Sequence, residues 1–136
     1  MSRRFCNNLF VYGTLRSGSQ NKFARLLAER GTLLGQARIQ GKMYHLDSYP
    51  GLALSSEPDK WVTGEVYRLH DPAGTLAILD DYEGCGPNDE LPYEFVRVPA
   101  KVRLLTGRHL SAWVYVYHQP VPEERRVLSG DYLDRA

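Results

Sequence analysis

Residues 71–84 read as one short helix that carries a carboxylate close to its C-terminal end. Asp71 is a favourable N-cap, and Pro72 suits the first helical position because no hydrogen bond is lost there. Gly84 supplies the left-handed residue at which many helices end. Glu83 is therefore expected in the last helical turn.

The predicted helix has one apolar arc, which at about 100° per residue contains Leu76, Ile78, Leu79 and Tyr82. Glu83 falls inside this arc, whereas Asp81 points away from it. Burial and the negative end of the helix dipole both disfavour the ionised carboxylate, so a raised pKa is expected. Such a group suits proton transfer near neutral pH. A salt bridge to a nearby arginine, or an exposed place on a frayed helix end, would also explain Glu83.

A second candidate is the turn Tyr12-Gly13-Thr14-Leu15-Arg16, which follows the short apolar strand 8–12. A glycine there lets the backbone approach a ligand, and the N–H groups after it can face an anion or a developing oxyanion. A tight turn that binds nothing is the alternative. The turn lacks the Gly-Lys-Ser/Thr of a Walker loop and the further glycines of a dinucleotide fingerprint.

The remaining reactive side chains give weaker signals. Three more carboxylates are candidates to approach the site, namely Glu65, Asp80 and Asp131. The four histidines have no metal-ligand spacing and no Cys-x-x-Cys is present, so no metal site is predicted. A Gly-x-Ser-x-Gly elbow is also missing, which argues against a serine nucleophile.

Several short strands must position these residues. Extended segments are expected at 8–12, 32–46, 61–69, 93–105 and 110–118, with bends at glycines inside 32–46 and a hairpin at 106–108. A further turn at 49–52 enters a short strand, and residues 20–30 form a second helix. The pattern predicts an α+β fold on a strongly curved or barrel-like, antiparallel sheet, with 110–118 central in it.

Length and charge narrow the function classes. The 136 residues predict a single domain over 1–136 with a core of its own. Seventeen basic and sixteen acidic residues leave a net charge of +1, which argues against a nucleic-acid partner. No apolar run of membrane-spanning length or signal-peptide type is seen, and the two cysteines fit a reducing compartment, so we expect a cytoplasmic protein.

Taken in order, these segments resemble the gamma-glutamylcyclotransferase-like family, which includes avirulence-induced and gamma-glutamylamine cyclotransferase types. The resemblance covers nearly the whole chain. It rests on six motifs in sequence: Phe10-Val11-Tyr12-Gly13-Thr14-Leu15-Arg16, Tyr49-Pro50-Gly51-Leu52 with Val62-Thr63-Gly64-Glu65-Val66-Tyr67, Leu79-Asp80-Asp81-Tyr82-Glu83-Gly84, Tyr93-Glu94-Phe95-Val96-Arg97-Val98, Ala112-Trp113-Val114-Tyr115-Val116-Tyr117 and Ser129-Gly130-Asp131-Tyr132-Leu133.

The resemblance implies a small mixed barrel with two flanking helices and an intramolecular acyl transfer. The α-amine of a gamma-glutamyl group attacks its own γ-amide carbonyl, which yields 5-oxoproline and releases an amine or amino acid. Neither cofactor nor metal is implied. Glu83 takes the place of the catalytic glutamate, and the substrate-binding positions are Tyr12, Gly13, Thr14, Leu15, Tyr93 and Tyr115.

The partner implied is a small gamma-glutamyl compound, with neither nucleic acid nor membrane, and the oligomeric state is left open. The leaving group is also open among a free amino acid, the lysine ε-amine, a polyamine and a modified antibiotic. Asp89 and Glu90, in the loop after Glu83, would favour a cationic one. The alternative function is a module on the same fold that binds a small ligand or another protein without catalysis.

Overall fold

The computed structural model describes six parts of the chain, which are residues 6–12, 22–45, 50–86, 93–121, 123–127 and 130. They hold six β-strands, two α-helices and one short 3-10 helix.

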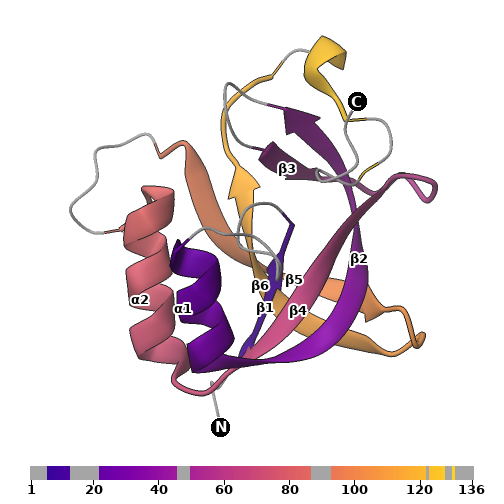
Figure 1. The fold of residues 1–136 in the computed structure, drawn as a ribbon. Helices are drawn as coiled ribbons and strands as arrows, with labels where there is room; N and C mark the ends of the chain where they lie inside the picture. The colour runs from indigo at the N-terminus through magenta and orange to yellow at the C-terminus, as the bar shows by residue number, and fades with distance from the viewer. Residues whose placement is uncertain are drawn as a thin grey trace, which may run out of the picture.

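Five strands close into a barrel, with each strand paired to the next around the ring (Figure 1). In ring order they are β2 (Gly31–His45), β4 (Trp61–Leu69), β1 (Asn8–Val11), β6 (His109–Tyr117) and β5 (Phe95–Leu104), which pairs back to β2. The sixth strand, β3 (Pro50–Leu54), pairs with the far end of β2. The barrel-like α+β fold is confirmed, and β6 lies between two neighbours as predicted.

The mixed sheet that the family resemblance implies is confirmed, whereas the strand pattern alone favours an antiparallel sheet and does not predict one pairing. β1 and β6 run parallel, with Leu9 opposite Trp113, whereas the other strand pairings are antiparallel. A parallel pair needs a long crossover connection, and here most of the chain lies between the two strands. Local strand patterns contain no information on such a pairing.

Two helices cover one side of the barrel. α1 (Lys22–Arg30) and α2 (Pro72–Glu83) stand side by side against it, and the 3-10 helix η1 (Glu123–Arg125) follows β6 near the opposite end of the molecule (Figure 1). The predicted helix 20–30 is confirmed from residue 22 onward, since residues 20 and 21 lie outside the described parts.

Strand alternation divides the apolar residues between two cores. Phe10 and Tyr12 point into the barrel, where they join a core that includes Ile39, Val66 and Val114. The intervening residues of β1 point outward and pack under the helices, in a second core that contains Leu9, Val11, Leu27, Leu79 and Tyr115. The wall of the barrel therefore separates the hydrocarbon interior from the face that carries α2.

Two glycines inside strands occupy places where a side chain would be strained or would clash. Gly35 has φ +140° beside a register shift between β2 and β4, as expected for a bulge. Gly64 of β4 packs directly against β1: a Cβ added there would meet the carbonyl oxygen of Val11 and lie 2.6 Å from Cζ of Phe10. No side chain larger than hydrogen fits at Gly64 without moving β1.

Candidate functional site

The helix that carries Glu83 begins and ends as its sequence predicts. The Asp71 side chain accepts a hydrogen bond from the Gly74 N–H at 3.3 Å, and Pro72 is the first residue of α2. Gly84 has the left-handed φ of +79°. Its N–H donates to the Asp81 carbonyl at 3.2 Å. Glu83 is thus the last residue of a helix with a defined end, which fixes its position on the fold.

The buried face of α2 differs from the predicted arc. Thr75, Leu76 and Leu79 are buried, Glu83 is half-buried beneath them, and Tyr82 is 39% exposed. Including Tyr82 in the buried arc was wrong, because its ring packs sideways on Phe23 of α1, with 4.1 Å between centroids, and does not enter the core. The buried face of α2 is therefore rotated relative to the predicted apolar arc. As a result, Glu83 lies nearer to the centre of the inward face than the sequence pattern predicts.

The surroundings of Glu83 favour its protonated form. Burial is the largest cause, followed by the negative charges of Glu94 and Asp80, and together they raise the pKa of Glu83 from 4.5 to about 7. Desolvation disfavours a charge that no partner compensates, and like charges add to this effect. A carboxyl group with this pKa exchanges protons readily near neutral pH.

The arginine salt bridge that was the alternative for Glu83 is formed by Asp80 instead. Within the described parts of the chain, no Lys or Arg pairs with Glu83. Arg97 of β5 binds Asp80 through both carboxylate oxygens, with Nε–Oδ1 at 2.7 Å and Nη2–Oδ2 at 2.9 Å. The sequence predicts Asp80 as a carboxylate that approaches the site, but it does not predict Arg97 as its partner. One signal for it existed: Arg97 shares the apolar face of β5 with Phe95, where a cation needs a partner.

Two predicted substrate-binding tyrosines lie close to Glu83, and their hydroxyls are bonded within the protein. Tyr115 donates to Oδ1 of Asp80 at 2.7 Å, and Tyr12 donates to the Tyr115 carbonyl at 2.6 Å. Tyr12 also accepts from the Leu52 N–H at 3.3 Å. Burial is the largest cause that raises the pKa of both tyrosines above the ordinary value, so both stay protonated. The charge of Glu83 adds to it at Tyr12, and the hydrogen bond to Asp80 adds to it at Tyr115.

Tyr93, the third predicted tyrosine, stands beside the segment that follows Glu83. Its hydroxyl donates to the Gly86 carbonyl at 3.2 Å, and its own carbonyl accepts from the Gln119 side chain at 3.0 Å. The predicted binding residues Gly13, Thr14 and Leu15 lie outside the described residues, as do Asp89 and Glu90 of the loop. The chain enters the first of these two gaps directly after Tyr12.

Two other carboxylates were predicted to approach the site. Glu65 is buried on β4 opposite Val11, and Asp131 lies outside the described residues. The thiols of Cys6 and Cys85 form no disulfide with each other. Among the side chains that the structure describes, no group of three His, Cys, Asp or Glu residues is arranged to hold a metal ion.

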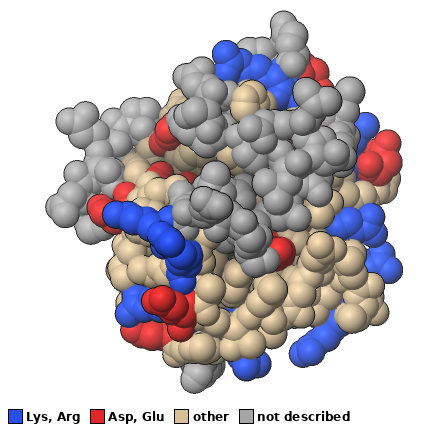
Figure 2. Space-filling model, in the orientation of Figure 1, with Lys and Arg blue, Asp and Glu red and all other residues tan. Residues whose placement is uncertain are grey.

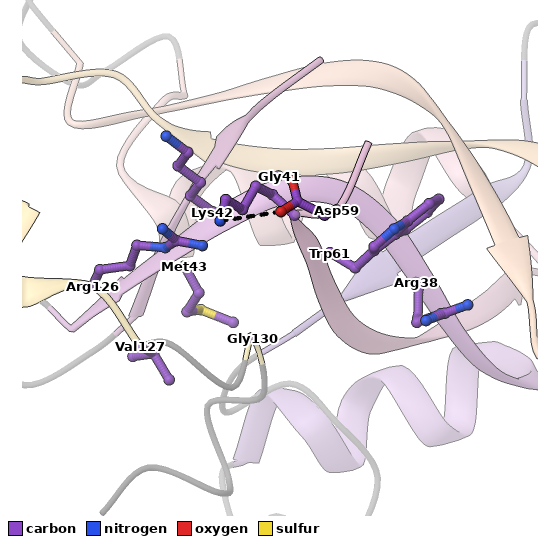
Figure 3. Close-up of a pocket in the computed structure, with 10 residues that line it drawn as sticks. Arg38, Gly41, Lys42, Met43, Asp59, Trp61, Arg126, Val127 and Gly130 are labelled. Atoms are coloured by element: carbon purple, nitrogen blue, oxygen red, sulfur yellow. Dashed lines mark ion pairs between the residues drawn. The ribbon is translucent and has the colours of Figure 1, made fainter. Parts of the chain in front are cut away.

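A pocket of about 300 Å³ lies elsewhere, where β2 leaves β4 and the C-terminal segment crosses it (Figure 3). The basic side chains that line this pocket already have partners within the protein. Lys42 pairs with Glu57 at 2.7 Å, and the Arg38 guanidinium lies over the Trp61 ring at 5.0 Å. Lys60 and Arg126 also have acidic neighbours. The described candidates Tyr12, Glu83, Tyr93 and Tyr115 are not among its described lining residues, so this pocket is separate from the Glu83 region.

The described charged side chains on one face of the molecule are of mixed sign (Figure 2). On the face in Figure 2, the described Lys and Arg side chains are scattered among Asp and Glu and form no continuous basic stripe. No helix in the described parts has the length and hydropathy to cross a membrane.

Comparison with known proteins places this geometry in a family. The model of the family "Gamma-glutamyl cyclotransferase, AIG2-like" matches residues 9–134. The chain is 36% identical over 128 residues to the gamma-glutamylcyclotransferase family protein YtfP of Escherichia coli K12, covering 93% of this chain and 96% of that protein. It is 37% identical over 122 residues to the gamma-L-glutamyl-butirosin B gamma-glutamyl cyclotransferase of Niallia circulans, covering 86% and 70%.

The fold agrees with these matches. The crystal structure of an AIG2-like protein from Mus musculus superposes with a TM-score of 0.67 at 26% identity, covering 86% of this chain and 80% of that one. A gamma-glutamylaminecyclotransferase from Rattus norvegicus is 27% identical over 133 residues, covering 85% and 81%. The chain therefore belongs to the AIG2-like gamma-glutamyl cyclotransferase family and is an enzyme of this type.

Proposed function

We propose that Glu83 is the general acid and base of a reaction that cyclises a gamma-glutamyl group to 5-oxoproline. The observation that carries this proposal is a half-buried carboxyl group with no described cationic partner and a pKa of about 7. At that pKa the base form and the acid form are both well populated near neutral pH. One residue can then serve both halves of a proton transfer.

The reaction needs a folded substrate and a route for protons. Ionised Glu83 takes a proton from the α-ammonium group, and the free amine attacks the γ-carbonyl carbon to form a five-membered ring. The ring nitrogen loses a second proton as the γ-amide bond breaks, and both protons, one of them carried by Glu83, pass to the departing nitrogen. The protons that leave the α-nitrogen end on the leaving amine, so Glu83 finishes in its starting state. Because the nucleophile and the electrophile belong to one molecule, the task of the protein is to hold the glutamyl chain folded for attack.

The oxyanion formed at the γ-carbonyl needs hydrogen-bond donors. By the family resemblance, we assign this role to the backbone N–H groups of Gly13, Thr14 and Leu15. What supports the assignment is the place of Tyr12, whose hydroxyl is tied to Tyr115 near Glu83 and whose next residue begins this loop. Tyr93 would form part of the wall on the other side.

We further propose that the leaving group is a neutral or cationic amine. The charges that face Glu83 are those of Glu94 and Asp80, both negative, and they would repel the carboxylate of a departing amino acid. Two relatives named above, the butirosin enzyme and the rat enzyme, bear the names of such substrates.

The test is release of 5-oxoproline from a matched panel, in which gamma-glutamyl-ethylamine and gamma-glutamyl-putrescine, whose leaving amines carry no carboxylate, are compared with gamma-glutamyl-alanine. Wild-type protein should turn over the amines faster than the alanine derivative. Glu83→Gln should lose at least about a hundredfold in kcat, while Asp81→Asn, an exposed carboxylate two residues away, should keep full activity. Turnover by folded Glu83→Gln would refute the role of Glu83. Binding of the panel without any release by wild type would favour the non-catalytic module instead.

A further inference from the structure

The last turn of α2 is held on the barrel by the side chain of Asp80. Both of its carboxylate oxygens accept from Arg97, at 2.7 and 2.9 Å, and Oδ1 also accepts from the Tyr115 hydroxyl at 2.7 Å. Arg97 and Tyr115 stand directly opposite each other on β5 and β6. A bidentate pair between partly buried partners is geometrically specific, so it fixes the rotation of the helix as well as its distance from the sheet.

Arg97 and Tyr115, the partners of Asp80, each make a further contact within the barrel wall. The Arg97 guanidinium lies over the Trp113 ring at 4.4 Å, and the Tyr115 carbonyl accepts from Tyr12. The main-chain carbonyl of Asp80 accepts from the Cys85 N–H at 3.0 Å, which closes the helix end around Glu83. Asp80 therefore connects α2 with β5 and β6 through its side chain and with the helix cap through its backbone.

Glu83 follows Asp80 by three residues, so the two side chains are neighbours on the same helix face. We propose that Asp80, Arg97 and Tyr115, here called the Asp80 network, are positioning residues that orient Glu83 toward its substrate. This inference rests on the proposed function. It also reassigns Tyr115, whose hydroxyl donates its proton to Asp80 and therefore cannot donate it to the substrate.

The Asp80 network also adds charges of opposite sign near Glu83. The groups that face it are Asp80 on α2, Glu94 just before β5, Tyr12 just after β1 and Tyr115 on β6, and Arg97 acts on it through Asp80. Removing the Asp80 charge leaves Glu83 with one negative neighbour fewer. Removing the Arg97 charge leaves Asp80 uncompensated. The two changes should therefore move the proton affinity of Glu83 in opposite directions.

The experiment uses the full-length chain with Asp80→Asn, Arg97→Gln and the exposed control Asp81→Asn. The Glu83 carboxyl carbon is followed by 13C NMR against pH, and its resonance is assigned with Glu83→Gln. The titration midpoint should fall by roughly 0.5–1 pH unit in Asp80→Asn and rise by a similar amount in Arg97→Gln. It should stay unchanged in Asp81→Asn. Shifts of the same sign, or none, would overturn the inference.

Turnover gives a second, independent readout. The acidic limb of kcat/KM against pH should follow the same two shifts. Tyr115→Phe removes one hydrogen bond and no charge, so it should lower kcat about tenfold or more, with KM and the acidic limb little changed. A Tyr115→Phe variant that raises KM alone would assign Tyr115 to the substrate and contradict its positioning role. The NMR midpoints need no catalysis, so activity in Glu83→Gln would refute the proposed function and leave them standing.

Discussion

The hydroxyl of Tyr12 donates to the main-chain carbonyl of Tyr115 at 2.6 Å, across the one parallel strand pair of the described barrel. The same oxygen accepts from the Leu52 N–H of β3. One phenol thus satisfies two backbone groups of different strands in a buried place. Tyr12 is the residue that follows β1 and directly precedes Gly13, the first of the predicted backbone donors.

Tyr12→Phe should destabilise the protein by about 2 kcal/mol. The substitution leaves a buried carbonyl and a buried N–H without their partner, which costs the desolvation of each group. Urea unfolding at neutral pH measures the difference. The matched control is Tyr44→Phe, since Tyr44 is equally buried but its hydroxyl lies 3.4 Å from Glu123. We expect that control to cost well under 1 kcal/mol, and equal losses in the two variants would contradict the special role of Tyr12.

The stability of the fold should fall as Glu83 ionises. Its pKa is about 7 in the folded protein and 4.5 in an unfolded chain, so the folded state binds more protons between these values. The free energy of unfolding therefore decreases as pH rises through this window. Below pH 4.5 the contribution is fully retained, and above pH 7 it is lost.

Glu83→Gln removes this titration and should be more stable than wild type at pH 8, by at most about 3 kcal/mol. At pH 4 the two proteins should differ little, because the wild-type carboxyl is then protonated in both states. Urea titrations at the two pH values give the comparison. A wild type that is the more stable protein at pH 8 would mean that Glu83 has a compensating cation.

The helix that carries Glu83 could be read from the sequence because its signals are local. Asp71, Pro72 and Gly84 act within one turn of the residues that they cap, so their effect needs no knowledge of the fold. The strands were predicted almost as well, since β4 has the expected bounds of 61–69. Their alternation follows from burial on the two faces of a barrel wall.

The contacts that position the site could not be read in the same way. Asp80 and Arg97 are 17 residues apart, and their pairing depends on the rotation of α2 against β5. The sequence pattern made Asp80 a candidate to approach the site, but it placed Tyr82 in the apolar arc and named no partner for Asp80. The exposed place of Tyr82 depends on its contact with Phe23. Phe23 belongs to α1, so the pattern of α2 alone cannot predict this contact. Tertiary contacts of this kind override local amphipathicity.

Gly64→Ala should be one of the most damaging single methyl additions in the chain. The added carbon would overlap the Val11 carbonyl oxygen and the Phe10 ring, both parts of β1, which a barrel cannot displace without opening. We expect a loss above about 3 kcal/mol. Gly107→Ala is the control, because Gly107 has space around it and only a left-handed φ of +97° to strain, at a cost of about 1–2 kcal/mol. Thermal or urea unfolding should rank the two in this order, and the reverse rank would contradict the close packing of β1 on β4.

Glu94 provides the sharpest electrostatic test of the site, because it raises the pKa of Glu83 from an exposed position. Glu94→Gln should lower that pKa and move the acidic limb of kcat/KM to lower pH, whereas Glu94→Asp keeps the charge and should leave the limb nearly unchanged. Salt screens an exposed charge more than a buried one. Raising the ionic strength from about 0.01 to about 0.5 M should therefore lower the wild-type midpoint and have less effect on Glu94→Gln. If the two proteins respond equally to salt, the charge of Glu94 does not reach Glu83, and burial with Asp80 alone sets its pKa.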